Sequence, residues 1–90
     1  MPQRVYQRDV AMTGDWVALA SESTVLNWVI VSCPPGNAAN VTIRDKAHTE
    51  NTKVWVPGEW HRFEHLDLAT LEAHGQADDT VSIVGQAGGL

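Results

Sequence analysis

The chain has 90 residues, with 6 Lys and Arg against 11 Asp and Glu, which gives a formal net charge of −5. A chain of this length forms one domain and buries only about 60–65% of its unfolded surface, so little room remains for a deep catalytic cleft beside a core. The acidic balance argues against nucleic acid as the main partner, because phosphate binding requires clustered Lys and Arg.

The single cysteine, Cys33, excludes an intrachain disulfide and a cysteine-based zinc site. The opening Met-Pro-Gln-Arg is not followed by the apolar run of a signal peptide. No apolar stretch approaches the roughly 20 residues that span a bilayer. We therefore expect a protein without a cofactor and without membrane contact, made in a reducing cytoplasm.

Residues 1–13 mix apolar and polar positions and are interpreted as an extended N-terminal arm or an edge strand. Arg4 and Arg8 are the only charges among the first eight residues, whereas the C-terminal third is acidic. Such an arm could complement the acidic part of a neighbouring copy, which makes Arg4, Tyr6 and Arg8 interface candidates. A solvated acidic face is the simpler alternative.

Short strands follow in chain order, and apolar and polar residues alternate cleanly in those at 40–45 and 80–84. The expected strands cover residues 16–19, 24–33, 40–45, 53–56 and 80–84. The stretch 24–33 is the strongest and has apolar residues on both faces, so we expect it to be central in a sandwich or covered by another subunit. In the next strand Val41 and Ile43 are expected to face inward.

The remaining segments are expected to be loops, turns or ends. Residues 46–52 are polar and predict a loop. Val54 and Val56 share one face of their strand, which leaves Trp55 on the opposite face, away from the expected core. Gly85 is expected to end the last strand, so that residues 86–90 form a flexible tail.

Residues 60–74 allow two interpretations. As a helix, they would carry His61, Glu64 and His65 in the H-x-x-E-H pattern of zinc peptidases. This pattern has only three fixed positions and no supporting motif for a third protein ligand, so we predict neither a metal site nor catalytic residues. We favour strands, with Pro57-Gly58 as the corner before a strand at 59–65, then a turn, then a strand at 68–74.

The fold class is therefore all-β, a small antiparallel β-sandwich or barrel of about 6–8 short strands with an extended N-terminal arm. The single β domain is expected to cover residues 14–85.

The order of the strands and turns between residues 40 and 85 resembles small β-domain virion proteins of tailed bacteriophages. The matching pieces are Asn40-Val41-Thr42-Ile43-Arg44-Asp45-Lys46, Val56-Pro57-Gly58-Glu59, Leu66-Asp67-Leu68-Ala69-Thr70-Leu71 and Ala77-Asp78-Asp79-Thr80-Val81-Ser82-Ile83-Val84-Gly85. One departure is Asp78-Asp79, where those proteins usually have a Gly-Asp turn.

The resemblance implies a capsid decoration (cement) protein on the outer surface of the virion head, with no catalytic residues. Its partners would be the major capsid protein and copies of itself, with a trimer implied by analogy. A head–tail connection protein is an alternative from the same resemblance.

Four tryptophans are many for a domain of this size. We expect Trp28 in the core, and Trp55 and Trp60 on the surface beside the corner, where aromatic side chains are favoured as interface anchors. The same two aromatics could instead stack on sugar rings, so a carbohydrate-binding or host-surface-binding module is the second hypothesis.

Overall fold

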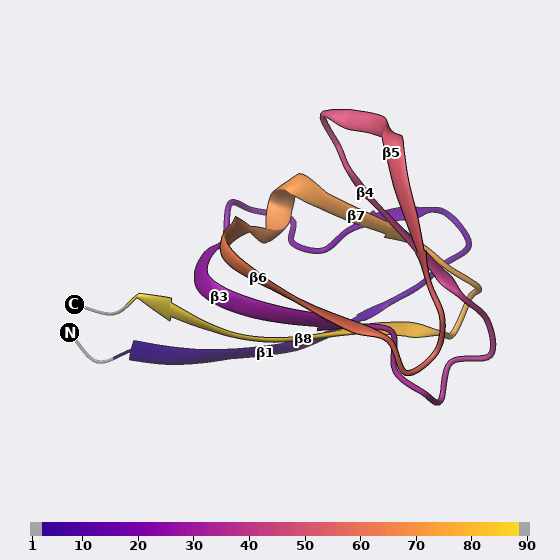
Figure 1. The fold of residues 1–90 in the computed structure, drawn as a ribbon, viewed down its shortest axis with the longest axis horizontal. Coiled ribbons are helices and arrows are strands. Elements are labelled where there is room, and N and C mark those ends of the chain that lie inside the picture. Colours follow the sequence, from indigo (N-terminus) through magenta and orange to yellow (C-terminus); the bar gives the residue numbers. More distant parts are fainter. Residues whose placement is uncertain (1–2, 89–90) are drawn as a thin grey trace.

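A computed structural model describes residues 3–88 of the chain as eight strands in two four-stranded antiparallel sheets (Figure 1). Sheet A has the order β1-β8-β3-β6 and sheet B the order β2-β7-β4-β5. The strands are β1 (Gln3–Ala11), β2 (Trp16–Ala18), β3 (Val25–Ser32), β4 (Val41–Asp45), β5 (His48–Trp55), β6 (Trp60–Asp67), β7 (Leu71–His74) and β8 (Thr80–Gly88). The all-β prediction is confirmed, and the sheets form a sandwich. Among the described residues no helix is long and apolar enough to cross a membrane.

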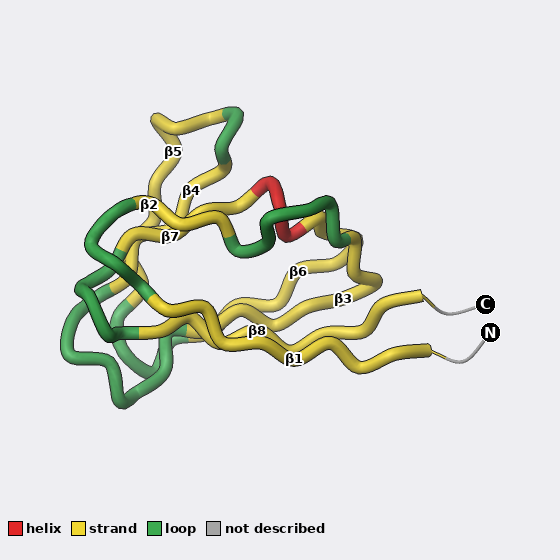
Figure 2. The backbone as a smooth tube through the Cα atoms, turned by 180° about the vertical axis from the view of Figure 1, so that it is seen from behind, coloured by secondary structure: helices red, strands yellow, loops and turns green. Residues whose placement is uncertain are grey.

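Consecutive strands alternate between the two sheets, and only the β4–β5 hairpin stays within one sheet. Figure 2 shows the two layers joined by short loops and by one helical turn. Figure 1 shows β4 and β5 rising away from the sandwich, while β1 and β8 run out together toward the two termini. The expected N-terminal arm is thus an edge strand, paired with β8 along its whole length.

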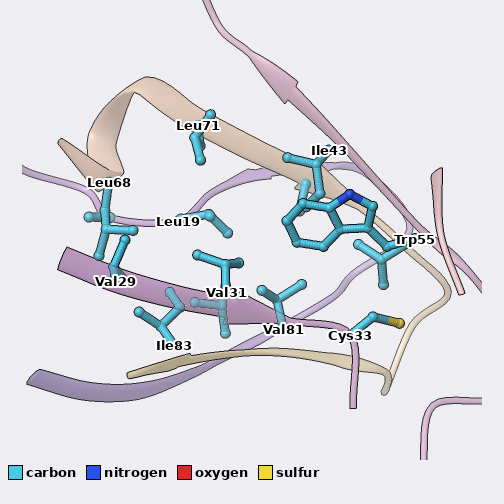
Figure 3. Close-up of a cluster of buried hydrophobic side chains, with 14 of the residues drawn as sticks. Leu19, Val29, Val31, Cys33, Ile43, Trp55, Leu68, Leu71, Val81 and Ile83 are labelled. Atoms are coloured by element: carbon cyan, nitrogen blue, oxygen red, sulfur yellow. The ribbon is translucent and has the colours of Figure 1, made fainter. Parts of the chain in front are cut away.

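The core lies between the sheets and follows the period of two that strands impose on their side chains. In β3 and β8 the buried residues include Val29, Val31, Val81 and Ile83. Figure 3 shows them pointing from sheet A toward Ile43 and Leu71 of sheet B. Val41 and Ile43 are buried, as their alternation predicted.

The tryptophan predictions are wrong for two residues. Trp55 is only 5% exposed and packs in the core (Figure 3), while Val54 and Val56 face solvent. Trp28, expected in the core, is half-buried on the outer side of β3. Val54 and Val56 do share one face, as the alternation within residues 53–56 predicts. The buried face, however, is the opposite one, which carries Trp55.

An irregularity in the β3–β6 ladder turns Trp28 outward. Leu26 and Val29 are both fully buried although they lie three residues apart, which a regular strand cannot achieve. Between them the pairing skips Asn27 and His65, and His65 has a φ of 52°. A non-glycine residue at positive φ is uncommon and marks an irregular backbone. Leu26 and Val29 thus both lie inside, while Trp28 between them lies on the outer side.

Several strand boundaries differ from the prediction. β6 continues to Asp67 and β7 begins only at Leu71, and β5 and β8 are longer than expected. The polar residues 46–52 were expected to form a loop, but β5 begins at His48, because a hairpin exposed on both faces needs no apolar alternation. Likewise β8 does not end at Gly85 but continues to Gly88. A Cβ at Gly85 would lie 2.6 Å from the Trp28 carbonyl oxygen, so this glycine permits close approach of β3. Residues 89–90 of the expected tail lie outside the described residues.

Residues 60–74 form two strands, as favoured from the sequence, joined by a 3-10 turn at Leu68–Thr70. Asp67 fixes this crossover from sheet A to sheet B. Its carboxylate accepts hydrogen bonds from the Ser23 hydroxyl (2.6 Å) and from the backbone N–H groups of Thr24 (2.8 Å) and Ala69 (3.0 Å). These bonds lower the pKa of Asp67 below its usual value, the Ser23 hydroxyl most strongly.

Asp78 and Asp79 lie in the turn that precedes β8. Asp78 has a φ of 76°, a backbone conformation that glycine adopts without strain and aspartate tolerates better than most residues. Asp79 is only 6% exposed, and its carboxylate accepts hydrogen bonds from the Ala38 and Ala39 backbone N–H groups at 2.9 and 3.0 Å. It thereby attaches the β3–β4 loop to the start of β8.

Candidate binding surface

The Pro57-Gly58 corner is a tight turn that carries the chain from sheet B to sheet A. Glu59 donates its backbone N–H to the Val56 carbonyl (2.9 Å), and Gly58 has a φ of 96°. Proline at the second position and glycine with positive φ at the third are the requirements of a type II turn. The corner expected from the sequence is confirmed.

Hydrogen bonds hold this corner against the end of β3. The Gly58 N–H donates to the Cys33 carbonyl (2.7 Å), and the Cys33 N–H donates to the Glu59 carbonyl (2.8 Å). The next residue, Trp60, therefore enters β6 directly opposite Ser32. Its side chain is 60% exposed, on the outer face of sheet A.

A shallow pocket of about 380 Å³ lies beside Trp60. Its walls are mainly apolar and come from Trp60, Ile30, Gly58 and the prolines Pro34 and Pro35. The residues that line the pocket include no Asp, Glu, His, Lys or Arg. The pocket therefore suits the insertion of an apolar group from a partner.

From this pocket an apolar stripe crosses sheet A. We use "the apolar stripe" for Trp60 of β6, Ile30 of β3, Val84 of β8 and Val5 of β1. Ile30 and Val84 are direct cross-strand partners, and the other two residues lie diagonally next to them. Trp60, Val84 and Val5 are 60%, 40% and 71% exposed. One apolar residue from each strand thus faces solvent on the same side.

Polar side chains lie along one side of the apolar stripe. Trp28 donates its indole N–H to the Gln86 side-chain oxygen (2.9 Å), and the Arg62 guanidinium lies 5.2 Å from the Trp28 ring centre. Arg62 also pairs with Glu64 at 3.3 Å. Trp28 is therefore tethered by its own neighbours, whereas the Trp60 ring is open to solvent.

Below the corner a second group of side chains covers Trp55. The centres of the His61 and Trp55 rings are 4.6 Å apart. The His61 Nε2 is 2.6 Å from a Glu59 carboxylate oxygen. This hydrogen bond lowers the pKa of Glu59 below its usual value. A hydrogen bond from the Val56 N–H lowers it further, by a smaller amount. His61 thus covers the core indole and is held in place by Glu59.

The H-x-x-E-H residues lie on a strand. His61 packs on Trp55, Glu64 pairs with Arg62 on the outer face, and His65 occupies the irregularity in β6. Within residues 3–88, no three His, Cys, Asp or Glu side chains are grouped so that they could hold a metal ion. The helical arrangement on which the zinc interpretation depended is absent from this segment.

The predicted interface residues are divided between different environments. Trp60 lies on the apolar stripe, whereas Trp55 is in the core and cannot contact a partner. Tyr6 is half-buried and Arg8 exposed, both in β1. Arg4 pairs with Ala87 in the same ladder, but its side chain lies outside the described part of the structure.

The sequence analysis did not assign Ile30, Val84 and Val5 to a surface. A signal was present in the stretch 24–33, which has apolar residues on both faces and was expected to be central or covered by another subunit. β3 is central in sheet A, between β8 and β6, yet its outer face is not covered by any other described element. The central position is confirmed, and cover by another subunit stays a prediction.

Comparison with models of known protein families, with curated proteins and with solved structures finds no match for this chain.

Proposed function

We propose that this chain is a non-enzymatic structural protein of a tailed-bacteriophage virion, and specifically a decoration (cement) protein that binds the outer surface of the head. The proposal combines the resemblance of residues 40–85 with one structural observation. That observation is the apolar stripe, which has an exposed tryptophan and a shallow apolar pocket at one end.

The stripe has the properties of a protein-docking surface. Tryptophan buries a large area with little loss of side-chain freedom and is enriched among the residues that contribute most to binding. Ile30 and Val84 lie on central strands of sheet A, so they are presented by a rigid backbone. A ligand that binds only the assembled shell stabilises that shell by mass action, which is the action of a cement protein.

The test uses capsids assembled without this protein. The added chain should copurify with these shells and raise their melting temperature, because binding favours the assembled state. Failure of the wild-type chain to bind shells that lack it would disprove the proposal.

Two matched variants locate the contact. Val84→Asp places a charge on the apolar stripe, and Val54→Asp places the same charge on an exposed valine of sheet B. A carboxylate buried at an interface without a partner is costly, so Val84→Asp should weaken shell binding by about tenfold or more, equivalent to about 1.4 kcal/mol. Val54→Asp should bind as the wild type does. Equal loss in both variants would contradict the assignment of the stripe.

The carbohydrate-binding hypothesis loses one of its two aromatic residues, because Trp55 is in the core. Trp60 remains as a single exposed indole beside an apolar pocket. Titration with a panel of glycans distinguishes the two functions. A saturable change of tryptophan fluorescence that Trp60→Ala abolishes would support the sugar module. Binding to tail-connection complexes and not to shells would support the head–tail alternative.

A further inference from the structure

Sheet A ends at β1, whose outer edge carries no other strand in the described structure. β1 pairs with β8 through nine consecutive residues, Gln3 to Ala11, without a register shift. It contains no proline. A long, regular edge strand of this kind presents unpaired backbone groups that can pair with another strand.

The other three edge strands are protected by devices that natural sheets use against such pairing. β2 has only three residues. β5 is polar and exposed along nearly its whole length, and its ladder with β4 has a register shift at Arg44 and Asp45. β6 is interrupted at His65 by positive φ. Among the described edges, β1 alone is long and free of a register shift and of positive φ, although it carries charges at Arg8 and Asp9.

The ladder shows which backbone groups of β1 are free. The Met12 N–H donates to the Asp79 carbonyl (2.8 Å), in the same register as the β1–β8 pairs. Since hydrogen-bonded residues alternate along an antiparallel strand, the even-numbered residues of β1 bond to β8. Val5, Gln7 and Asp9 therefore direct their backbone N–H and C=O groups away from the sheet.

We propose that β1 pairs in antiparallel orientation with β1 of a second copy of this chain, about a two-fold axis at Gln7. This register is the one in which Gln3–Ala11 overlaps completely with itself. Gln7 then faces Gln7 of the partner subunit, and Val5 faces Asp9 of the partner subunit. Free N–H and C=O groups meet at each of these positions, because all of them belong to the odd-numbered set.

Side-chain chemistry favours the same register. Tyr6 and Arg8 share the inner side of β1, and the pairing places Tyr6 opposite Arg8 of the partner subunit, where a guanidinium can contact an aromatic ring. Arg8 is exposed and has no ion pair with a described residue. Moving the axis to Tyr6 would place Arg4 opposite Arg8, and moving it to Arg8 would place Arg8 opposite itself, so both shifts oppose like charges.

The pairing joins two copies of sheet A into one continuous eight-stranded sheet. A two-fold axis perpendicular to a sheet keeps its faces, so the apolar stripes of both copies lie on the same side. The assembly is two-fold, unlike the trimer that the virion resemblance implies. The inference depends only on the β1 edge and does not require the proposed function.

Mass measurement by light scattering and backbone amide exchange by NMR test the pairing on the full chain. The wild type should have twice the mass of one chain, and the amides of Val5, Gln7 and Asp9 should be protected from exchange. Dilution to the monomer should remove this protection, while the Tyr6 and Arg8 amides, which bond to β8, stay protected. A chain that remains monomeric at high concentration, or an oligomer with unprotected odd-numbered amides, overturns the proposal.

A matched pair of variants provides the second test. Gln7→Pro removes an edge N–H that points away from β8 and bonds to none of residues 3–88, a position where sheets accept proline. It should halve the measured mass and leave the circular dichroism spectrum unchanged. Gln7→Thr keeps the N–H and should remain a dimer. A folded Gln7→Pro dimer contradicts the pairing, and if this variant fails to fold, the amide-exchange result on the wild type decides.

Discussion

The outer faces of the two sheets each carry tryptophan and arginine, but only one face leaves an indole open. On sheet B the Arg44 guanidinium lies 3.7 Å from the Trp16 ring centre, and its Nε is 2.5 Å from a Glu72 carboxylate oxygen. His74 covers the same indole at 5.4 Å between ring centres. On sheet A no described side chain covers Trp60 in this way, and Trp60 is 60% exposed.

The difference shows that composition alone does not identify a contact surface. Both faces contain large aromatic side chains, and both lie on a rigid sheet. On sheet B the cation, carboxylate and imidazole satisfy one another around Trp16, so a partner would have to displace existing contacts. On sheet A the apolar stripe has no such cover, so a partner gains the full burial of its apolar area.

The largest expected effect separates the tryptophans on either side of the corner. Trp55→Ala should destabilise the fold by about 3–5 kcal/mol, because it removes a large side chain from the core. Trp60→Ala should change stability by no more than about 0.5 kcal/mol, because the side chain is largely solvent-exposed. Urea unfolding followed by far-ultraviolet circular dichroism measures both. Comparable losses would place Trp60 in the core and remove the contrast between the faces.

The next effect concerns the close approach of β3 and β8 under the apolar stripe. Gly85→Ala should destabilise the fold by about 1–3 kcal/mol, since the new Cβ meets backbone and core atoms. Gly36→Ala is the control, because apart from its chain neighbours no described residue has an atom within 4 Å of its Cβ position. Thermal unfolding compares them, and a Gly85→Ala protein as stable as Gly36→Ala would show that sheet A is more loosely packed than the structure indicates.

A smaller effect compares the two cation–aromatic contacts directly. A double-mutant cycle between Arg44→Ala and Trp16→Leu should give a coupling free energy of about 0.5–1 kcal/mol. The matching cycle between Arg62→Ala and Trp28→Leu should give less, because that guanidinium is 5.2 Å from its ring centre and not 3.7 Å. Equal coupling on both sheets would mean that the face of sheet A is as well covered as that of sheet B.

The smallest effect concerns Asp67, which holds the crossover between the two sheets. Its pKa is lowered in the folded state, so its stabilising effect is present above the unfolded value of about 4 and is lost as pH falls through the folded pKa. The wild type should melt at a higher temperature than Asp67→Asn near neutral pH. The difference should shrink as the pH is lowered below about 4. A difference independent of pH would mean that the charge of Asp67 does not contribute.

The sequence by itself determined the all-β class, the Pro57-Gly58 corner and the inward positions of Val41 and Ile43. Each of these depends on neighbouring residues only. Val41 and Ile43 alternate with polar residues, and Pro57-Gly58 has the residues that its turn requires. For the candidate surface, the sequence indicated Trp60 beside that corner.

Only the tertiary structure decided which face is buried around Trp28 and Trp55, and where β5 and β8 begin or end. Residues 53–56 alternate equally well with either face inward, and packing against His61 and Phe63 placed Trp55 inside. Trp28 became a surface residue because the β3–β6 ladder is irregular at Asn27 and His65.

The apolar stripe and the free β1 edge were also decided by the tertiary structure. The stripe combines one residue from each of four strands that are distant in sequence, so no local pattern contains it. The edge is free because β8 pairs with β1 on one side and sheet A ends on the other. Local sequence sets the strands and turns, whereas the exposed surface depends on strand order, which arises from packing between distant segments.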